Sequence, residues 1–169
     1  MGRKSKTKEK EPEEGVENVT MEDQELSYDE KLKYVSVIAK PMATKSQAKR
    51  LYRLIKKASK EKGYIRSGLK DVQRRIRLGE RGLCVFAGNV TPIDVICHMP
   101  AVCEDKSIPY CYTPSRVDLG AAMGVKRGSV MILVKPHASY QELYDEIYSE
   151  LKAMPVPAGD NLYLPQEKL

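Results

Sequence analysis

The stretch Leu83-Cys-Val-Phe-Ala-Gly-Asn89 joins five apolar residues to a Gly-Asn turn signal. An apolar run without polar alternation is typical of a short strand that is covered on both faces. Two further runs have this character, Val130-Met-Ile-Leu-Val134 and Tyr110-Cys-Tyr-Thr113, and Tyr64-Ile-Arg66 is a shorter strand candidate. The sequence therefore predicts a small sheet that is buried between helices.

Helical patterns lie between these strands. The first follows a capping box, Thr44-Lys-Ser-Gln47, and its apolar residues recur at helical spacing until Gly63. The second begins after Gly68, where apolar residues are spaced three and four apart. Three more helices are expected behind capping signals: Thr91 with Pro92, Ser115 with Asp118, and Ser139 with Glu142. Alternating strands and helices predict an α/β fold, a three-layer α-β-α sandwich.

The chain has 169 residues, enough for one ordinary domain with tails. Residues 1–27 mix basic and acidic runs with few large apolar side chains, and we expect a disordered charged tail there. Residues 28–157 are expected to form the folded domain, with 28–43 as an ordered arm, and residues 158–169 a C-terminal tail. No apolar run is long enough to span a membrane, and the first residues lack the apolar core of a secretory signal. We therefore expect neither membrane association nor secretion.

The positive charge is concentrated in one part of the chain. Residues 44–81 carry fourteen Lys or Arg against three Asp or Glu, whereas the whole chain has a net charge of +6. Such a field of one sign attracts a polyanion, and nucleic acid is the leading candidate. A solvated lysine-rich helix is the alternative, but acidic partners at helical spacing are nearly absent.

The helix after Gly68 is the most specific candidate for a nucleic-acid contact. Its first turn presents free N–H groups to a phosphate, and Lys70 and Arg74 lie one turn apart. Arg77 and Arg81 are expected to continue the same stripe. Asp71 and Gln73 are polar enough to read bases, although spacing alone does not show that they reach them.

A second basic segment follows the small-residue helix that begins at Ser115. We expect this loop to meet the start of the Gly68 helix, with an unpaired base resting on Val125 while Lys126 and Arg127 hold phosphates. An ordinary basic turn is an equally consistent interpretation of the segment. The tyrosines do not cluster with the basic residues, which disfavours an aromatic stacking platform.

Side chains suited to catalysis or metal binding are few. Cys84 and Cys111 lie inside predicted strands, where a buried, reduced thiol is the ordinary interpretation. His98 and His137 adjoin prolines and lack a second ligand at metal-binding spacing, so packing or capping roles are expected. Gly120-Ala-Ala-Met-Gly124 matches neither the dinucleotide-binding nor the P-loop pattern, and its small residues are expected to permit close packing. We therefore expect no enzyme activity, no metal and no cofactor.

Several strings occur in order along the chain: Gly68-Leu-Lys-Asp-Val-Gln73, Gly82-Leu-Cys-Val-Phe-Ala-Gly-Asn89, Thr91-Pro-Ile-Asp94, His98-Met-Pro100, Cys103-Glu-Asp-Lys106, Ile108-Pro-Tyr110 and Leu119-Gly-Ala-Ala122. With them the chain resembles the ribosomal and nucleolar RNA-binding proteins that recognise kink-turns, over roughly residues 36–157. The Gly-Leu-Lys-Asp-Val-Gln and Cys-Glu-Asp segments make the H/ACA ribonucleoprotein branch of that family the nearest in character.

The resemblance implies an α-β-α sandwich with a small mixed central sheet and a location in the nucleus and nucleolus. It implies a non-catalytic place in the particle that converts uridine to pseudouridine in ribosomal RNA, and so a part in ribosome biogenesis. The implied partners are the H/ACA guide RNA and the pseudouridine synthase subunit of the dyskerin family. A small bridging subunit would connect that synthase, which holds the catalytic aspartate, to this chain.

Kink-turn binders of this family carry Gly-x-Asn-Glu at the start of the RNA-contacting helix, where Asn and Glu bond to the guanines of sheared G·A pairs. The matching positions here are Gly68, Lys70 and Asp71, and the following basic contact matches Arg74. Because an Asn amide donates and accepts whereas a lysine ammonium only donates, the exchange favours phosphate attraction over base reading. We therefore expect RNA binding that depends strongly on salt and weakly on sequence.

Three alternatives stay open at this point. A ribosomal or spliceosomal kink-turn protein is disfavoured by the acidic and basic tail and by the missing Asn. A small α/β enzyme acting on a phosphorylated metabolite would use the glycine-rich segments and the basic helix. A scaffold for protein contacts would use the apolar surface around residues 92–113.

Overall fold

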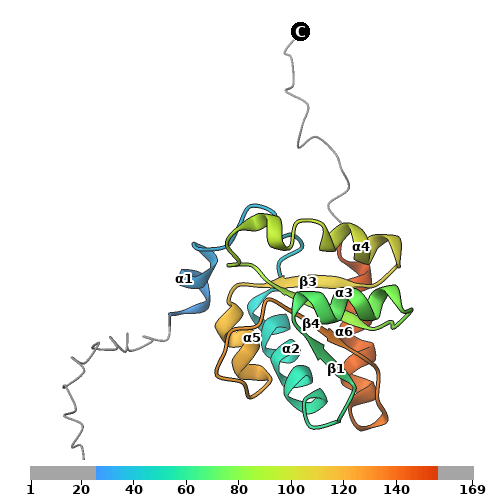
Figure 1. Cartoon of the computed structure of the whole chain (residues 1–169). Helices are drawn as coiled ribbons and strands as arrows, with labels where there is room; N and C mark the ends of the chain where they lie inside the picture. Colours follow the sequence, from blue (N-terminus) through green and yellow to red (C-terminus); the bar gives the residue numbers. More distant parts are fainter. Residues whose placement is uncertain (1–25, 156–169) are drawn as a thin grey trace, which may run out of the picture.

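The computed structural model describes residues 26–155, so nearly all of the two expected tails lies outside the described residues. The helices and strands follow one another in this order: α1 Tyr28–Leu32, α2 Lys45–Ala58, β1 Ile65–Ser67, α3 Leu69–Arg77, β2 Leu83–Ala87, the 3-10 helix η1 Ile93–Val95, α4 Met99–Asp105, β3 Tyr110–Thr113, α5 Arg116–Ala122, β4 Met131–Val134, the 3-10 helix η2 Ala138–Tyr140 and α6 Gln141–Ala153 (Figure 1). All four predicted strands are present.

The four strands form one mixed sheet in the order β1-β4-β2-β3. Strands β2 and β3 are parallel, with Val85 opposite Cys111, whereas β4 runs antiparallel to both β1 and β2. Every residue of β2, β3 and β4 is buried. The continuous apolar runs of the sequence therefore correspond to strands that are covered on both faces, as predicted.

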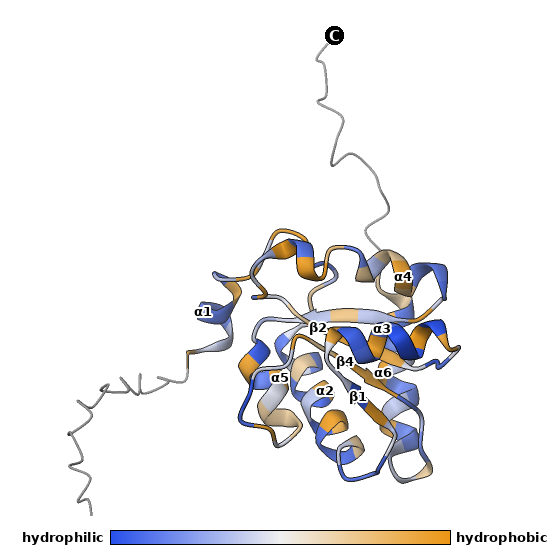
Figure 2. Ribbon diagram, viewed as in Figure 1, coloured by the Kyte–Doolittle hydropathy of each residue, from blue (hydrophilic) through white to orange (hydrophobic). Residues whose placement is uncertain are grey.

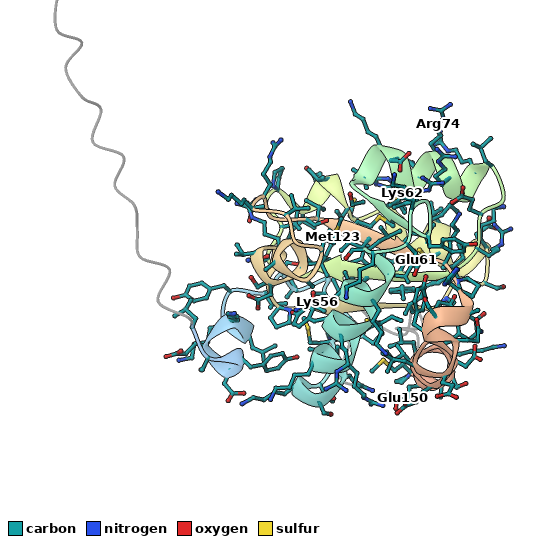
Figure 3. The ribbon with its side chains drawn as sticks, turned by 90° about the horizontal axis from the view of Figure 1, so that it is seen from below. Lys56, Glu61, Lys62, Arg74, Met123 and Glu150 are labelled. Atoms are coloured by element: carbon teal, nitrogen blue, oxygen red, sulfur yellow. The ribbon has the colours of Figure 1, made fainter. Side chains whose placement is uncertain are left out.

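The helices cover the sheet on both sides. Helix α2 packs against α5 and α6, and α3 packs against β1 and β4. Seen from below, α3 lies on one side of the sheet and α2 and α6 lie on the other (Figure 3). The expected three-layer α-β-α sandwich with a small mixed central sheet is thus confirmed.

Helix α2 shows why these residues form this layer. Thr44 caps its start in a reciprocal capping box with Gln47, as predicted. Its buried residues follow one face of the helix: Ala48, Leu51, Leu54, Ile55 and Ala58. The helix ends at Ala58, earlier than Gly63, because the chain turns at Ser59 before it enters β1. Figure 2 shows this division of hydrophilic and hydrophobic positions on the helices.

The expected arm at 28–43 is ordered and covers the outer edge of β3. Ser27 caps α1, and the Lys31 ammonium bonds both carboxylate oxygens of Asp118 at 2.7 and 2.8 Å. Main-chain bonds of 2.9 Å join the arm to Tyr112 on β3. The arm therefore satisfies the outward-facing main-chain groups of this edge strand at Tyr112.

Two local expectations were wrong. Thr91 does not cap a helix; a single 3-10 turn, η1, follows Pro92, and α4 begins only at Met99, with Pro100 in its first turn. Proline is favoured in the first turn of a helix because its missing N–H has no helical partner there, so Pro100 is compatible with the start of α4.

The expected capping box of Ser139 with Glu142 is also absent, because residues 138–140 form the 3-10 turn η2 ahead of α6. The His137 side chain caps that turn by accepting from the Ser139 N–H at 3.2 Å. The capping role expected for this histidine is confirmed.

Candidate nucleic-acid interface

The start of α3 is shaped by one glycine. Gly68 has φ +88°, a conformation that L side chains rarely adopt, and its N–H donates to the Met131 carbonyl of β4 at 3.0 Å. No side chain caps α3. The N–H groups of its first turn are therefore available to an anionic ligand, and the positive end of the helix dipole favours such a ligand.

Three cations of α3 are exposed to solvent. Lys70, Arg74 and Arg77 are exposed, and none of them forms an ion pair with any residue between 26 and 155. Arg74 extends away from the helix (Figure 3). We call Lys70, Arg74 and Arg77 the α3 ridge. Its charge is not neutralised by the fold.

The neighbouring Arg75 behaves differently. Its guanidinium lies 3.5 Å from the carboxylates of both Asp71 and Glu80. Asp71 therefore faces an arginine of its own helix. Gln73 lies 3.4 Å from the His98 ring nitrogen at the start of α4. The two polar residues considered for base reading thus have partners within the fold.

Arg81 does not continue the ridge, as had been expected. Helix α3 ends at Arg77, and Gly79, with φ +92°, turns the chain before β2. Arg81 is exposed in this connection and donates to the Glu80 carbonyl at 3.2 Å. The helical spacing that aligned Arg81 with Arg77 fails because the helix is one turn shorter than the pattern suggested.

The loop between α5 and β4 forms the other part of the site. Ser115 caps α5 as predicted, accepting from the N–H groups of Val117 and Asp118 at 3.2 and 3.4 Å. The helix ends ahead of Gly124, which has φ +76°. Beyond it the chain is exposed from Val125 to Gly128. The basic loop is therefore accessible on the surface.

Gly120 determines where this loop lies. It is buried, and a Cβ at that position would overlap the main-chain carbonyl of Arg127. The small-residue segment thus permits close packing, as predicted, and this packing fixes the loop against α5. A bond of 2.9 Å from the Ser129 N–H to the Arg116 carbonyl closes the loop.

The two segments meet around a small hollow. A cavity of about 260 Å³ separates the start of α3 from the α5–β4 loop. Its lining includes Gly68 and Leu69 from one side, Met123, Val125 and Arg127 from the other, and Val95 from η1. The expected meeting of the Gly68 helix with the Val125–Arg127 loop is confirmed, whereas Lys126 is exposed beside the hollow.

Val95 and Met123 were not singled out from the sequence. Val95 lies in the 3-10 turn η1, where the capping signal at Thr91 predicts a helix, and Met123 follows the last residue of α5. Val125, 46% exposed, adds an apolar surface at the rim. The hollow is therefore apolar on one side and basic at its edge, which suits an unstacked base whose phosphates lie outside.

Two of the cysteines, Cys84 and Cys111, are buried in strands of the sheet. Cys84, Cys103 and Cys111 are buried, and Cys97 is exposed. The Cys103 side chain, together with burial, raises the pKa of the Cys84 thiol well above its usual value, and burial raises the pKa of Cys111 to about 12. Both thiols stay protonated in the folded state, whereas nucleophilic attack requires a thiolate.

Within residues 26–155, no three His, Cys, Asp or Glu side chains are grouped so that they could hold a metal ion. In the same range, no helix has the length and apolar character needed to cross a membrane.

An α-β-α sandwich that exposes an unneutralised cationic ridge beside a small apolar hollow has the features of a small nucleic-acid-binding domain. The comparisons with known proteins agree with this class. The family model described as "Ribosomal protein L7Ae/L30e/S12e/Gadd45 family" matches residues 49–144. The chain belongs to this family and, within it, to the group of H/ACA ribonucleoprotein complex subunit 2 proteins.

The curated relatives are similar over most of their length. The "H/ACA ribonucleoprotein complex subunit 2" of Drosophila melanogaster is 60% identical over 140 residues, which cover 83% of this chain and 87% of the relative. The protein of that name from Bos taurus is 50% identical, over 79% of this chain and 86% of the relative.

A solved structure, "Giardia lamblia 15.5kD RNA binding protein", has a TM-score of 0.66 and 25% identity. The similarity covers 70% of this chain and 98% of that one.

Proposed function

We propose that this chain is a non-catalytic RNA-binding subunit of the H/ACA small nucleolar ribonucleoprotein, in which it binds the guide RNA. The observation that carries the proposal is the α3 ridge, which is exposed and forms no ion pair within residues 26–155, next to the start of α3. The names and high identity of the curated relatives support the particle to which we assign the chain.

The start of α3 and the α5–β4 loop divide the binding of RNA between them. The N–H groups after Gly68 and the side chains of Lys70 and Arg74 bind phosphates on one side of the hollow. Lys126 and Arg127 bind phosphates on the other side. An unpaired base enters the hollow between them and contacts Val125, which is already exposed.

Sequence selectivity is weak in this arrangement. Lys70 donates but does not accept, and Asp71 lies against Arg75, so neither side chain supplies the paired donor and acceptor that reads a guanine edge. Affinity therefore comes from phosphates and depends strongly on salt. The choice of RNA is left to the other subunits of the particle.

In the assembled particle, this chain holds the upper part of the guide-RNA hairpin. A small bridging subunit connects it to the pseudouridine synthase of the dyskerin family, whose aspartate performs the reaction. The chain then acts in the nucleolus and supports pseudouridylation of ribosomal RNA and ribosome biogenesis. Turnover of a phosphorylated metabolite by the isolated chain would contradict this non-catalytic role.

Sequencing of the copurifying RNAs tests the proposal. The full chain, tagged and purified from cells under native conditions, should enrich H/ACA guide RNAs together with the synthase. The variant with Lys70→Gln and Arg74→Gln should recover far less of this RNA. Enrichment of ribosomal or spliceosomal kink-turn RNAs, or no enrichment of RNA at all, would contradict the assignment.

A further inference from the structure

We infer that the outer face of α2 is a second site for the RNA phosphate backbone, separate from the α3 ridge. The site consists of Lys45, Lys49, Arg53 and Lys56, which we call the α2 stripe. This inference rests on the proposed function, because it takes the ligand of the chain to be RNA.

The geometry of the helix aligns these four side chains. They are spaced four, four and three residues apart, which places them within about 80° of one another around the helix axis. They span about 17 Å along the axis. The buried residues of α2 occupy the opposite face, so the stripe points away from the core.

The stripe is exposed and unneutralised. All four side chains are exposed, and between residues 26 and 155 none of them has a carboxylate within ion-pair distance. Arg50, a cation of α2 outside the stripe, does have carboxylate partners. This arginine faces α6 and forms ion pairs with Glu146 and Glu150, the latter at 2.7 Å.

This charge pattern opposes helix stability. Helix α2 contains six cations and no acidic residue. The helix dipole favours Lys56 and Lys57 in the last turn but disfavours Lys45 in the first turn. Like charges four residues apart, such as Lys45 with Lys49 and Lys49 with Arg53, also repel each other. If these charges served only to keep the helix surface soluble, alternating acidic and basic residues would do so and would also stabilise the helix. A polyanion bound along the stripe removes this repulsion.

The position of the stripe makes it a distinct site. Lys56 lies on α2 and Arg74 on α3, on opposite sides of the sheet (Figure 3). One strand of RNA held in the hollow beside α3 does not reach the α2 stripe without passing around the sheet. The stripe therefore binds a second segment of the same RNA, through phosphates and without base reading.

The salt dependence of RNA affinity tests this inference. Each phosphate contact with duplex RNA is expected to add roughly 0.9 to the slope of log affinity against log salt, the value known for B-form duplexes. The variant with Lys49→Gln, Arg53→Gln and Lys56→Gln should therefore lower that slope by about two to three. A matched variant with Lys33→Gln, Lys40→Gln and Lys152→Gln removes three exposed charges elsewhere, none of them ion-paired within residues 26–155, and should change the slope far less.

The measurement uses the full chain and a hairpin RNA with a long stem, followed by fluorescence anisotropy across a potassium chloride series. A slope for the α2 variant equal to that of the unchanged chain would overturn the inference, as would loss of an acidic protein partner without any change in RNA binding. A second variant, with Lys70→Gln, Arg74→Gln and Arg77→Gln, tests the proposed function independently of the α2 stripe. If only this α3 variant loses RNA, the proposed function stands and the α2 site does not.

Discussion

The α-carbon of Gly120 lies directly against the carbonyl oxygen of Arg127, so that α5 and the basic loop are packed main chain on main chain. The two residues are seven positions apart in the sequence, and their contact fixes the loop that carries Val125, Lys126 and Arg127. It places one wall of the hollow opposite the start of α3. The position of the loop therefore depends on the absence of a side chain at residue 120.

Replacement of Gly120 tests this dependence. Gly120→Ala should destabilise the chain by about 1–3 kcal/mol, because the added methyl group must displace the main chain of Arg127. It should also weaken RNA binding, because the loop moves away from α3. Urea unfolding and RNA titration measure the two effects.

Gly124→Ala is the control for this change. Gly124 has φ +76° but open space around its α-carbon, so its replacement carries only the backbone cost of about 1–2 kcal/mol. Equal stability of Gly120→Ala and the unchanged chain would contradict the packing account.

The conformation of Gly68 leads to a second prediction. Gly68→Ala should cost about 1–2 kcal/mol, because φ +88° is strained for alanine although nothing lies within 4 Å of the added methyl group. Gly63→Ala has the same strain, at φ +84°, and the same open surroundings. Both variants should lose similar stability, but only Gly68→Ala should lose RNA affinity, since Gly68 alone begins α3. Equal RNA affinity of the two variants would contradict a role of the α3 start in RNA binding.

Because of the buried thiols, the free energy of unfolding is expected to decrease at alkaline pH. Burial raises the pKa of Cys111 to about 12, so the folded chain keeps this proton after the unfolded chain has lost it near pH 9. The unfolded state then binds fewer protons than the folded state, and the free energy of unfolding falls as pH rises above about 9. The slope from this one group approaches about 1.4 kcal/mol per pH unit.

Cys111→Ala should therefore show a shallower decline of stability with pH than the unchanged chain, measured by urea unfolding under reducing conditions from neutral pH to pH ~11. Cys84 and the buried tyrosines maintain part of the decline, because their pKa values are raised as well. Parallel pH profiles for Cys111→Ala and the unchanged chain would be evidence against this linkage.

The sheet and most of its helices could be predicted from local sequence because the signals there are redundant. Leu83–Ala87 is apolar throughout and is followed by a turn pair, and α2 combines a capping box with one apolar face. The segment after Thr91 lacked this redundancy. Its capping residue and proline are as compatible with a 3-10 turn as with a helix, and the structure has the 3-10 turn η1 there, with Val95 lining the hollow.

The candidate site was predictable in its charges and less so in its apolar lining. Lys70, Arg74 and Arg77 follow from helical spacing, but the same spacing does not hold for Arg81, because α3 ends at Arg77 and Gly79, with φ +92°, turns the chain before Arg81 is reached. The hollow itself brings together Leu69, Val95 and Met123 from three elements. Such long-range proximity depends on how α3, η1 and α5 are arranged, which a pattern read along the chain does not contain. The role of these residues in RNA binding stays a prediction.

The most direct test of the central claim is a salt titration of RNA affinity on two RNAs, one with an internal loop of sheared G·A pairs and one a plain hairpin. The account predicts a steep linear fall of log affinity with log salt for both. It predicts that Lys70→Gln with Arg74→Gln lowers the slope by about two and weakens both RNAs alike. Selective loss of the sheared-pair RNA would show base reading at this helix, and identical binding by the variant and the unchanged chain at low salt would contradict the claim that the α3 ridge holds the RNA backbone.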